Sequence, residues 1–349
     1  MRTVASASPV DPMAGVWDMS RGRDRSAHGG WWATAAMAAA IVATMGAGIF
    51  GALVIQLLRP GPSPHPTALV VPDGTSVRGI AAILFDGGVL GEGVPFALGV
   101  RIVADNMPLQ AGEFIFPARA SALTAIGILA SSTPVAHPLT IPEGSTNAQI
   151  IALLEAAEGL TGQLSPLLYE GQLLPETYHF TRGDSVDSVI GRMRSAMDET
   201  METLWPQRAD NLPFATPEEA LILASIVERE TGLAAERRMV AGVFINRLRL
   251  GMRLQADPTV AYAVSGGQGL ERPLTLEDLR IDSPYNTYMY AGLPPGPIAN
   301  PGRASIEAVL NPAPTSAIYF VADGNGGHAF ADTLAEHNAN VARYRAILR

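Results

Sequence analysis

The stretch LILASIVERETG, from Leu221 to Gly232, combines an apolar helical pattern with two carboxylates just before a glycine. Its apolar residues cover almost every direction of a helical wheel, and a helix that is apolar all round is buried. Thr216 and Glu219 predict a capping box at the start of this helix, and Gly232 predicts its end. Acidic residues normally favour the other end of a helix, where the dipole attracts them. The two glutamates therefore indicate a function.

Glu228 is the first of these two acids, and the pattern places it beside Leu221 and Ala224 in the last turn. Desolvation and the negative end of the helix dipole would both disfavour its charged form. A carboxyl that keeps its proton near neutral pH is what a general acid needs. Glu230 falls about 200° further round the helix, follows Arg229, and is expected to be solvated or ion-paired. The alternative for both is a frayed, wet last turn.

The composition excludes several classes of protein. The chain has 349 residues, of which 48% are hydrophobic and only 16% charged, so part of the apolar content is expected to lie in a membrane. The net charge of −9 argues against a nucleic-acid partner. The absence of cysteine excludes disulfides, a thiolate nucleophile and cysteine-ligated metals.

The segment 31–58 predicts a transmembrane helix. It runs for 28 residues without a charge, and about 20 apolar residues span a bilayer. It is longer than the core of a signal peptide and is followed by RPGPSPHP, which offers no cleavage site. Arginines precede the segment at positions 21, 23 and 25, so the positive-inside rule places the tail 1–30 in the cytoplasm.

An internal repeat follows residues 59–66, whose prolines predict a stiff linker between the membrane and the rest of the chain. VPDGTSVRGIAAIL (71–84) matches IPEGSTNAQIIALL (141–154), and FPARASALTAIGIL (116–129) is a weaker copy. Each copy predicts a strand end, a proline-marked turn, a Ser or Thr cap and a short helix. The strand candidates are TALVV, GEFIF and HPLTI. Residues 67–159 are therefore predicted to form a small α+β module, either a packing module or a carbohydrate-binding one.

Residues 160–349 predict a mixed helix and strand domain. A second helix is expected over 234–250, and YFVADGNGGHAF predicts a hairpin that turns at 323–327. Two segments carry aromatic, amide and hydroxyl side chains that suit sugar rings. MRLQADPTVAY, expected to be non-helical at these positions, offers Gln255, Asp257 and Thr259. SPYNTY offers Tyr285, Asn286 and Tyr288. The alternative is ordinary turn chemistry.

The ordered motifs LASIVERET, VFINRLRLGMRLQADPTVAY, SPYNTY…GLPPGPIANPG and YFVADGNGGHAF…HN resemble the endolytic murein transglycosylase family (MltG, YceG-like). The resemblance implies an α+β protein of the bacterial inner membrane, with one transmembrane helix, a LysM-like module and a periplasmic catalytic domain. It implies a lyase that cleaves MurNAc–GlcNAc β-1,4 bonds within peptidoglycan strands and leaves 1,6-anhydro-MurNAc ends. Its catalytic residue would be Glu228, the first glutamate of the motif. LLPETYHF matches another family segment and would place Glu176 and Tyr178 near the cleft.

The resemblance also suggests cooperation with penicillin-binding-protein wall synthases, and it implies no cofactor. A single acid can serve such a lyase, so no metal is required, and His328 and His337 are expected to be structural or surface residues. Two alternatives remain. One is a glycoside hydrolase in which Asp257 partners Glu228, because hydrolases usually need two carboxylates. The other is a wall-binding scaffold without catalysis.

Overall fold

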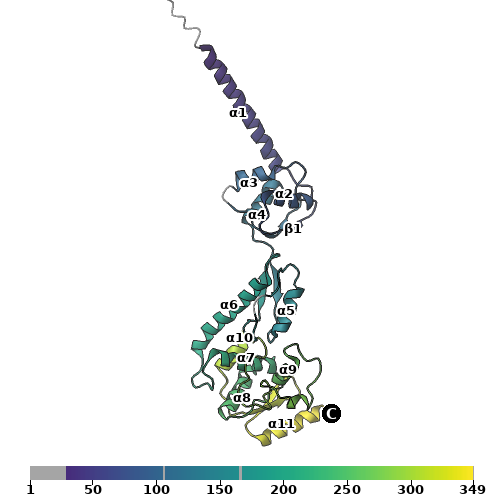
Figure 1. Ribbon diagram of the computed structural model, residues 1–349, viewed down its shortest axis with the longest axis vertical. Coiled ribbons are helices and arrows are strands. Elements are labelled where there is room, and N and C mark those ends of the chain that lie inside the picture. The colour runs from purple at the N-terminus through teal and green to yellow at the C-terminus, as the bar shows by residue number, and fades with distance from the viewer. Residues whose placement is uncertain (1–28, 105–106, 165–166, 349) are drawn as a thin grey trace, which may run out of the picture.

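The computed structural model describes residues 29–104, 107–164 and 167–348, so nearly all of the expected cytoplasmic tail lies outside the described residues. Figure 1 shows one long N-terminal helix, a small folded unit below it and a larger lower body. The lower body has two hydrophobic cores, so the chain forms three units in all. The mixture of helices and short antiparallel strands confirms the prediction of an α+β chain with one apolar N-terminal helix.

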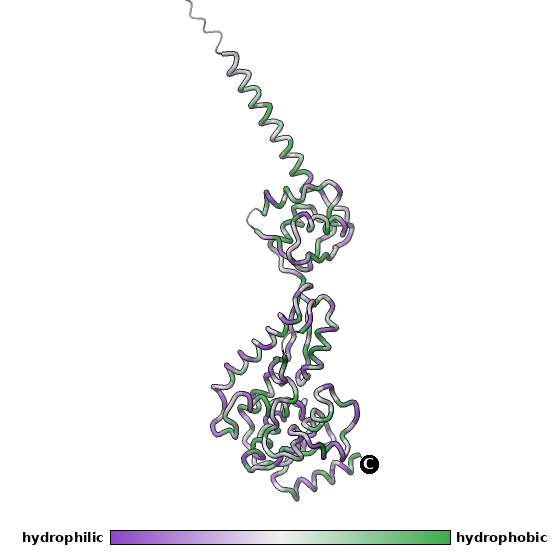
Figure 2. The backbone as a smooth tube through the Cα atoms, in the orientation of Figure 1, coloured by the Kyte–Doolittle hydropathy of each residue, from purple (hydrophilic) through white to green (hydrophobic). Residues whose placement is uncertain are grey.

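α1 (Gly29–Leu58) is the one helix in the described part of the chain that is long and apolar enough to cross a membrane. In Figure 2 this helix is coloured mostly white to green, without a strongly hydrophilic stretch. Its last turn is not free, since Leu57 is buried in the core of the first unit.

The first unit contains β1 (Thr67–Val71), α2 (Val77–Asp86), α3 (Phe96–Val103), β2 (Gly112–Phe116) and α4 (Ala122–Ser131). β1 and β2 pair antiparallel, and the helices enclose Phe114 and Phe116. Ser76 and Ser121 cap α2 and α4, which confirms two copies of the repeat.

The proline-rich segment 59–66 runs along this unit. Gly61 donates a backbone hydrogen bond to the carbonyl of Ala120, and Arg119 donates one to Ser63. The segment therefore packs against the unit and does not separate it from α1, in contrast to the expected linker.

The second unit is built on the third copy of the repeat. β3 (His137–Thr140) leads through the Thr146 cap into α5 (Asn147–Ala156), which confirms this copy. β3 pairs antiparallel with β4 (Thr177–Phe180), and α6 (Val186–Leu204) covers the pair. The expected domain boundary at residues 159 and 160 therefore falls inside a single folded unit.

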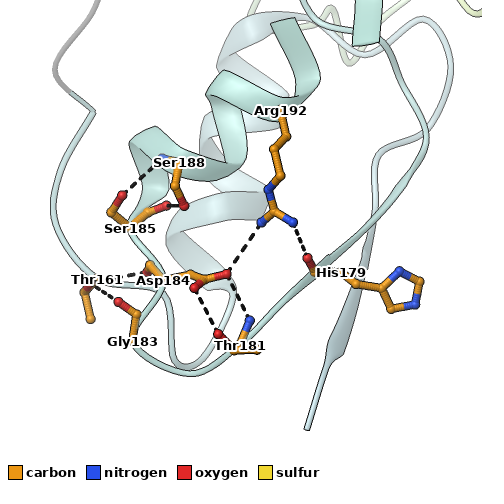
Figure 3. A network of polar contacts seen from close by, with 8 residues as sticks. All are labelled: Thr161, His179, Thr181, Gly183, Asp184, Ser185, Ser188 and Arg192. Atoms are coloured by element: carbon orange, nitrogen blue, oxygen red, sulfur yellow. Dashed lines mark hydrogen bonds and ion pairs between the residues drawn. The ribbon is translucent and has the colours of Figure 1, made fainter. Parts of the chain in front are cut away.

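A polar turn holds β4 and the start of α6 together (Figure 3). Asp184 accepts hydrogen bonds from the backbone and hydroxyl of Thr181, at 3.0 and 2.9 Å. Arg192 lies 3.6 Å from Asp184 and donates to the carbonyl of His179 at 2.5 Å. Ser185 caps the helix. Few of these groups are left to bind a ligand.

The third unit carries the buried helix. It contains η1 (Trp205–Gln207), α7 (Pro217–Glu230), α8 (Arg237–Arg249), α9 (Asp257–Ser265), η2 (Asp278–Arg280), α10 (Arg303–Leu310), β5 (Tyr319–Ala322), β6 (His328–Ala331) and α11 (Leu334–Ile347). The predicted capping box and hairpin are confirmed. The expectation of a non-helical segment at Asp257 and Thr259 is wrong, because α9 begins at Asp257 with Pro258 in its first turn.

Gly242 provides a test of how tightly the third unit is packed. It lies in α8, and a Cβ atom there would stand 2.8 Å from the carbonyl oxygen of Ala313 and 2.9 Å from Thr315 Cγ2. Because a backbone oxygen cannot move aside cheaply, Gly242→Ala is expected to destabilise the unit by about 1–3 kcal/mol. The measurement is the thermal midpoint of the full chain in detergent micelles.

Gly191→Ala is the matched control, since nothing lies within 4 Å of the corresponding Cβ in α6. It is expected to raise stability by up to about 1 kcal/mol through helix propensity. Equal midpoints for the two variants would contradict the close approach at Gly242.

Candidate active site

The two glutamates at the end of α7 point to different sides of the helix. α7 ends at Glu230, and Thr231 caps it in an extended conformation, one residue before the expected stop at Gly232. Positions 228 and 230 differ by about 200° on a helix. Their carboxyl groups therefore meet different neighbours.

Glu228 is buried, with 5% of its side chain exposed, as expected. Its partners are polar, however. Oε2 accepts a hydrogen bond from the backbone N–H of Gly302 at 2.9 Å, and Oε1 lies 3.6 Å from the Arg237 guanidinium. The expected burial is therefore present, and the helical wheel gave no sign of these two partners. With an N–H donor on one oxygen and a guanidinium near the other, the Glu228 side chain links separate segments of the chain.

The segments that meet at Glu228 belong to two units. Gly144, in the turn before α5, is so close that a Cβ there would lie 3.3 Å from Glu228 Cγ. Arg229 donates to the carbonyl of Gly144 at 3.3 Å, and Arg237 lies 4.0 Å from Glu143. Burial, followed by the charge of Glu228, raises the pKa of Glu143. These contacts fasten the second unit to the end of α7.

Asn300 completes this junction and was not singled out from the sequence. It is fully buried, and its Nδ2 donates to Ser145 O at 3.1 Å and to Asn147 Oδ1 at 2.9 Å. Its Oδ1 accepts a hydrogen bond from Leu173 N at 3.0 Å. The asparagine stands in the quoted GLPPGPIANPG motif, but nothing in that motif indicates its distant partners.

Glu230 has the environment that was expected for Glu228. It is half-buried, and burial raises the pKa of Glu230 to about 8, with the negative charge of Asp257 adding to the effect and Arg247 opposing it. The expectation that Glu230 is solvated or ion-paired is therefore wrong. This carboxyl keeps its proton near neutral pH.

Asp257 and Tyr288 stand beside Glu230. The hydroxyl of Tyr288 donates to Asp257 Oδ1 at 2.5 Å, and burial together with Asp257 raises the pKa of Tyr288. Arg247 is committed to the backbone, where it donates to Ile318 O at 2.7 Å and to Leu254 O at 2.5 Å. The arrangement places a protonated acid next to the carboxyl group of Asp257, whose position a tyrosine fixes.

The remaining predicted residues near Asp257 serve the backbone. Thr259 is fully buried, and its hydroxyl bonds to Ala256 O at 2.7 Å and to the Thr287 hydroxyl at 2.8 Å. Asn286, also fully buried, donates to Leu279 O and Ile281 O and accepts from Tyr288 N. Gln255 has a φ of 49° and an exposed side chain, and its backbone N–H bonds to Thr287 O. These residues shape the segment that carries Asp257 and Tyr288.

Tyr285 lines a cavity of about 710 Å³ between α5, α7 and α9. Its ring lies 4.9 Å, centroid to centroid, from that of Tyr262. Glu170 also lines the cavity, and burial raises the pKa of Glu170 to about 7 against the opposing hydrogen bond from Asn147 N. Aromatic walls with a few polar groups are typical of a small-molecule or sugar site. Sequence reasoning missed Glu170 and Tyr262, although Tyr262 stands in the quoted ADPTVAY.

Glu176 and Tyr178 lie at β4 in the second unit. Tyr178 is buried, its hydroxyl donates to Leu174 O at 2.7 Å, and burial raises its pKa. Glu176 is exposed. The hydroxyl of Tyr178 thus bonds within its own unit, apart from the glutamates at the end of α7.

The two histidines occupy separate places in the third unit. His328 Nδ1 lies 2.8 Å from Glu236 Oε2. His337 stacks on Tyr319 at 5.1 Å, and burial lowers the pKa of His337. The 29–104, 107–164 and 167–348 ranges contain no group of three or more His, Asp or Glu side chains that could hold a metal ion.

Comparisons with known proteins identify the family of this chain. The model of the YceG-like family matches residues 69–343. The endolytic murein transglycosylase of Bacillus subtilis (strain 168) is 34% identical over 309 residues, covering 78% of this chain and 83% of the relative. The one from Streptococcus pneumoniae serotype 2 (strain D39 / NCTC 7466) is 30% identical over 321 residues, and the match spans only 57% of that longer relative. A crystal structure of a YceG-like protein from Listeria monocytogenes is 30% identical, with a TM-score of 0.48 and coverage of 79% of this chain and 99% of that one. The family model and the Bacillus relative cover most of the chain, which therefore belongs to the YceG-like family.

Proposed function

We propose that this chain is a membrane-anchored endolytic lytic transglycosylase that cleaves MurNAc–GlcNAc β-1,4 bonds within peptidoglycan strands. Relatives over most of its length are named endolytic murein transglycosylases. The observation that carries the proposal is the Glu230 carboxyl, which retains its proton beside Asp257 and Tyr288. α1 would place the N-terminus in the cytoplasm and the three folded units in the periplasm, where the repeat units, proposed to be LysM-like, would contact the glycan.

In this mechanism Glu230 is the general acid. Its proton passes to the glycosidic oxygen as the bond to MurNAc C1 breaks, so the GlcNAc end leaves as an alcohol and positive charge develops on the MurNAc ring. Asp257 lies near enough for its charge to raise the pKa of Glu230. An ionised carboxylate there would also stabilise an oxocarbenium-like state.

The second step regenerates the acid. The Glu230 carboxylate takes the proton of the MurNAc C6 hydroxyl as that oxygen bonds to C1. This closes the 1,6-anhydro ring without adding water. Because the proton returns to Glu230, one residue serves both steps.

The glycan would be gripped by aromatic side chains on the same unit. Tyr262 and Tyr285 line the large cavity and offer ring faces for sugars. Tyr288 and Gln255 flank Asp257 and would contact the ring at the cleavage point. Thr259 and Asn286 would act indirectly, through the segment they hold.

Glu228, which occupies the catalytic place by resemblance, is then a positioning residue at the junction of the second and third units. In the hydrolase alternative the partner of Asp257 would then be Glu230 in place of Glu228, because the charge of Asp257 raises the pKa of Glu230. Both carboxylates would be needed if water attacked C1 in place of the C6 hydroxyl.

The test is digestion of purified peptidoglycan by the full chain in detergent micelles, followed by mass spectrometry of the glycan ends. The full chain is used because Leu53 and Leu57 of α1 pack in the core of the first unit. Internal cuts that leave anhydro ends, lighter than reducing ends by one water, are expected. Reducing ends would make the protein a hydrolase. No cleavage of a substrate shown to be competent would favour the wall-binding scaffold.

A further inference from the structure

The free length of α1 matches the thickness of a bilayer. Residues 31–50 are exposed along their whole length, and Leu53 is the first residue of the helix that packs against the core of the first unit. Twenty helical residues rise about 30 Å, which is the thickness of a hydrocarbon core. Leu53 and Leu57 beyond this point pack into the first unit. If α1 crosses the membrane, the first unit begins where the hydrocarbon ends.

α3 lies beside this end of α1. A Cβ on Gly99 would stand 2.6 Å from Leu57 Cδ2, so α3 and the last turn of α1 are in direct contact. Figure 1 shows α3 on the part of the unit from which α1 emerges. If α1 crosses the membrane, α3 is therefore at the level of the lipid headgroups.

The outer face of α3 is apolar. Phe96, Gly99 and Val100 face the core. Leu98 and Ile102, one turn apart on the outer side, are also apolar and are 46% and 49% exposed. A helix on the surface of a soluble unit would carry polar residues there. A helix that is apolar nearly all round indicates a second apolar neighbour.

We propose that the face of α3 formed by Leu98 and Ile102 lies on the lipid surface of the membrane that α1 crosses. The neighbouring Arg101 is exposed and would reach the anionic headgroups. The first unit is then fixed to the membrane by two elements, α1 and α3, and cannot swing freely about the end of the anchor. This holds whether or not the third unit cleaves glycan.

The test uses the absence of cysteine from the chain. A single cysteine introduced as Leu98→Cys or Ile102→Cys carries an environment-sensitive fluorophore in the full chain, reconstituted in phosphatidylglycerol and phosphatidylethanolamine nanodiscs. Nitroxide-labelled lipids report contact with the bilayer, and iodide reports contact with water. Met45→Cys, in the exposed part of α1, is the positive control. Leu276→Cys, at a residue 76% exposed in the third unit, is the matched control.

The expected result is a blue-shifted emission at positions 98 and 102 that is quenched by nitroxide in the shallow acyl region, because interfacial helices bury their apolar face by roughly 5–10 Å. Position 276 should be quenched by iodide alone. Iodide quenching of 98 and 102 as strong as that of 276 would overturn the proposal. A blue shift without nitroxide quenching would also overturn it, since a protein surface, such as a second copy, would then cover α3. If nitroxide-labelled lipids did not quench the label at position 45, α1 would not cross the membrane, and the proposal would fall with it.

Discussion

Glu230→Gln is expected to lower the rate of glycan cleavage by about 10²–10⁴-fold, the contribution of a positioned general acid. Glutamine keeps the size and polarity of the side chain but has no proton to give. Burial raises the pKa of the native carboxyl to about 8, so the wild-type residue is largely protonated at neutral pH. The measurement is the rate of release of anhydro-ended fragments, with wild-type and variant chains at pH 7.

Glu228→Gln is the matched control, made two residues away on the same helix. It weakens the contacts to Arg237 and Gly302, so a loss of about 1–3 kcal/mol in stability is expected. Cleavage should persist at a temperature where this variant is folded. The opposite pattern, with activity lost in a folded Glu228→Gln protein and retained in Glu230→Gln, would return the acid role to Glu228.

The stability of Glu230→Gln distinguishes lost chemistry from lost structure. The pKa of Glu230 is raised from 4.5 to about 8 on folding, so the native carboxyl contributes most to stability below pH 4.5. That contribution is lost as the pH rises through about 8, because the buried group must then ionise. The thermal midpoint of the variant is therefore expected to fall less than that of the wild type between pH 5 and pH 9.

Local structure could be predicted well from the sequence because its causes are local. The strand ends, turns and caps of the three repeats lie within about 14 residues of one another in each copy, and the structure confirms Ser76, Ser121 and Thr146 as caps. The strand partner of β3 could not be predicted, because β4 pairs with it from a position far along the chain. Because β3 and β4 lie on opposite sides of residue 159 in the sequence, the domain boundary expected there falls inside one folded unit.

The choice between the two glutamates shows the same limit. A helical wheel gives the direction of each carboxyl, but it does not say what packs there. The neighbours of Glu228 are Gly302 and Arg237, and the charge that acts on Glu230 comes from Asp257. Loops brought in by the tertiary fold therefore reverse the two environments expected from α7 alone. Arg229, which suggested an ion pair for Glu230, turns instead to Gly144.

Asp257→Asn is expected to shift the pH dependence of cleavage to lower pH without removing it. The negative charge of Asp257 is the second cause, after burial, of the raised pKa of Glu230. Asparagine removes that charge and can still accept the hydrogen bond from Tyr288. The proton on Glu230 is then lost at a lower pH, so the alkaline limb of the rate profile moves down. At a pH above the pKa of Glu230 in both proteins, each unit by which the substitution lowers that pKa reduces the cleavage rate about tenfold.

The full pH profile separates this role of Asp257 from direct catalysis. Below the alkaline limb of the variant, cleavage should return to within about tenfold of the wild-type rate, the remaining loss being electrostatic stabilisation of the ring cation. A folded Asp257→Asn protein that is inactive at every pH would make Asp257 a second catalytic carboxylate. Together with reducing glycan ends, that result would replace the lytic mechanism by hydrolysis. An unchanged profile would mean that Asp257 does not control the proton of Glu230, and burial alone would then have to hold it.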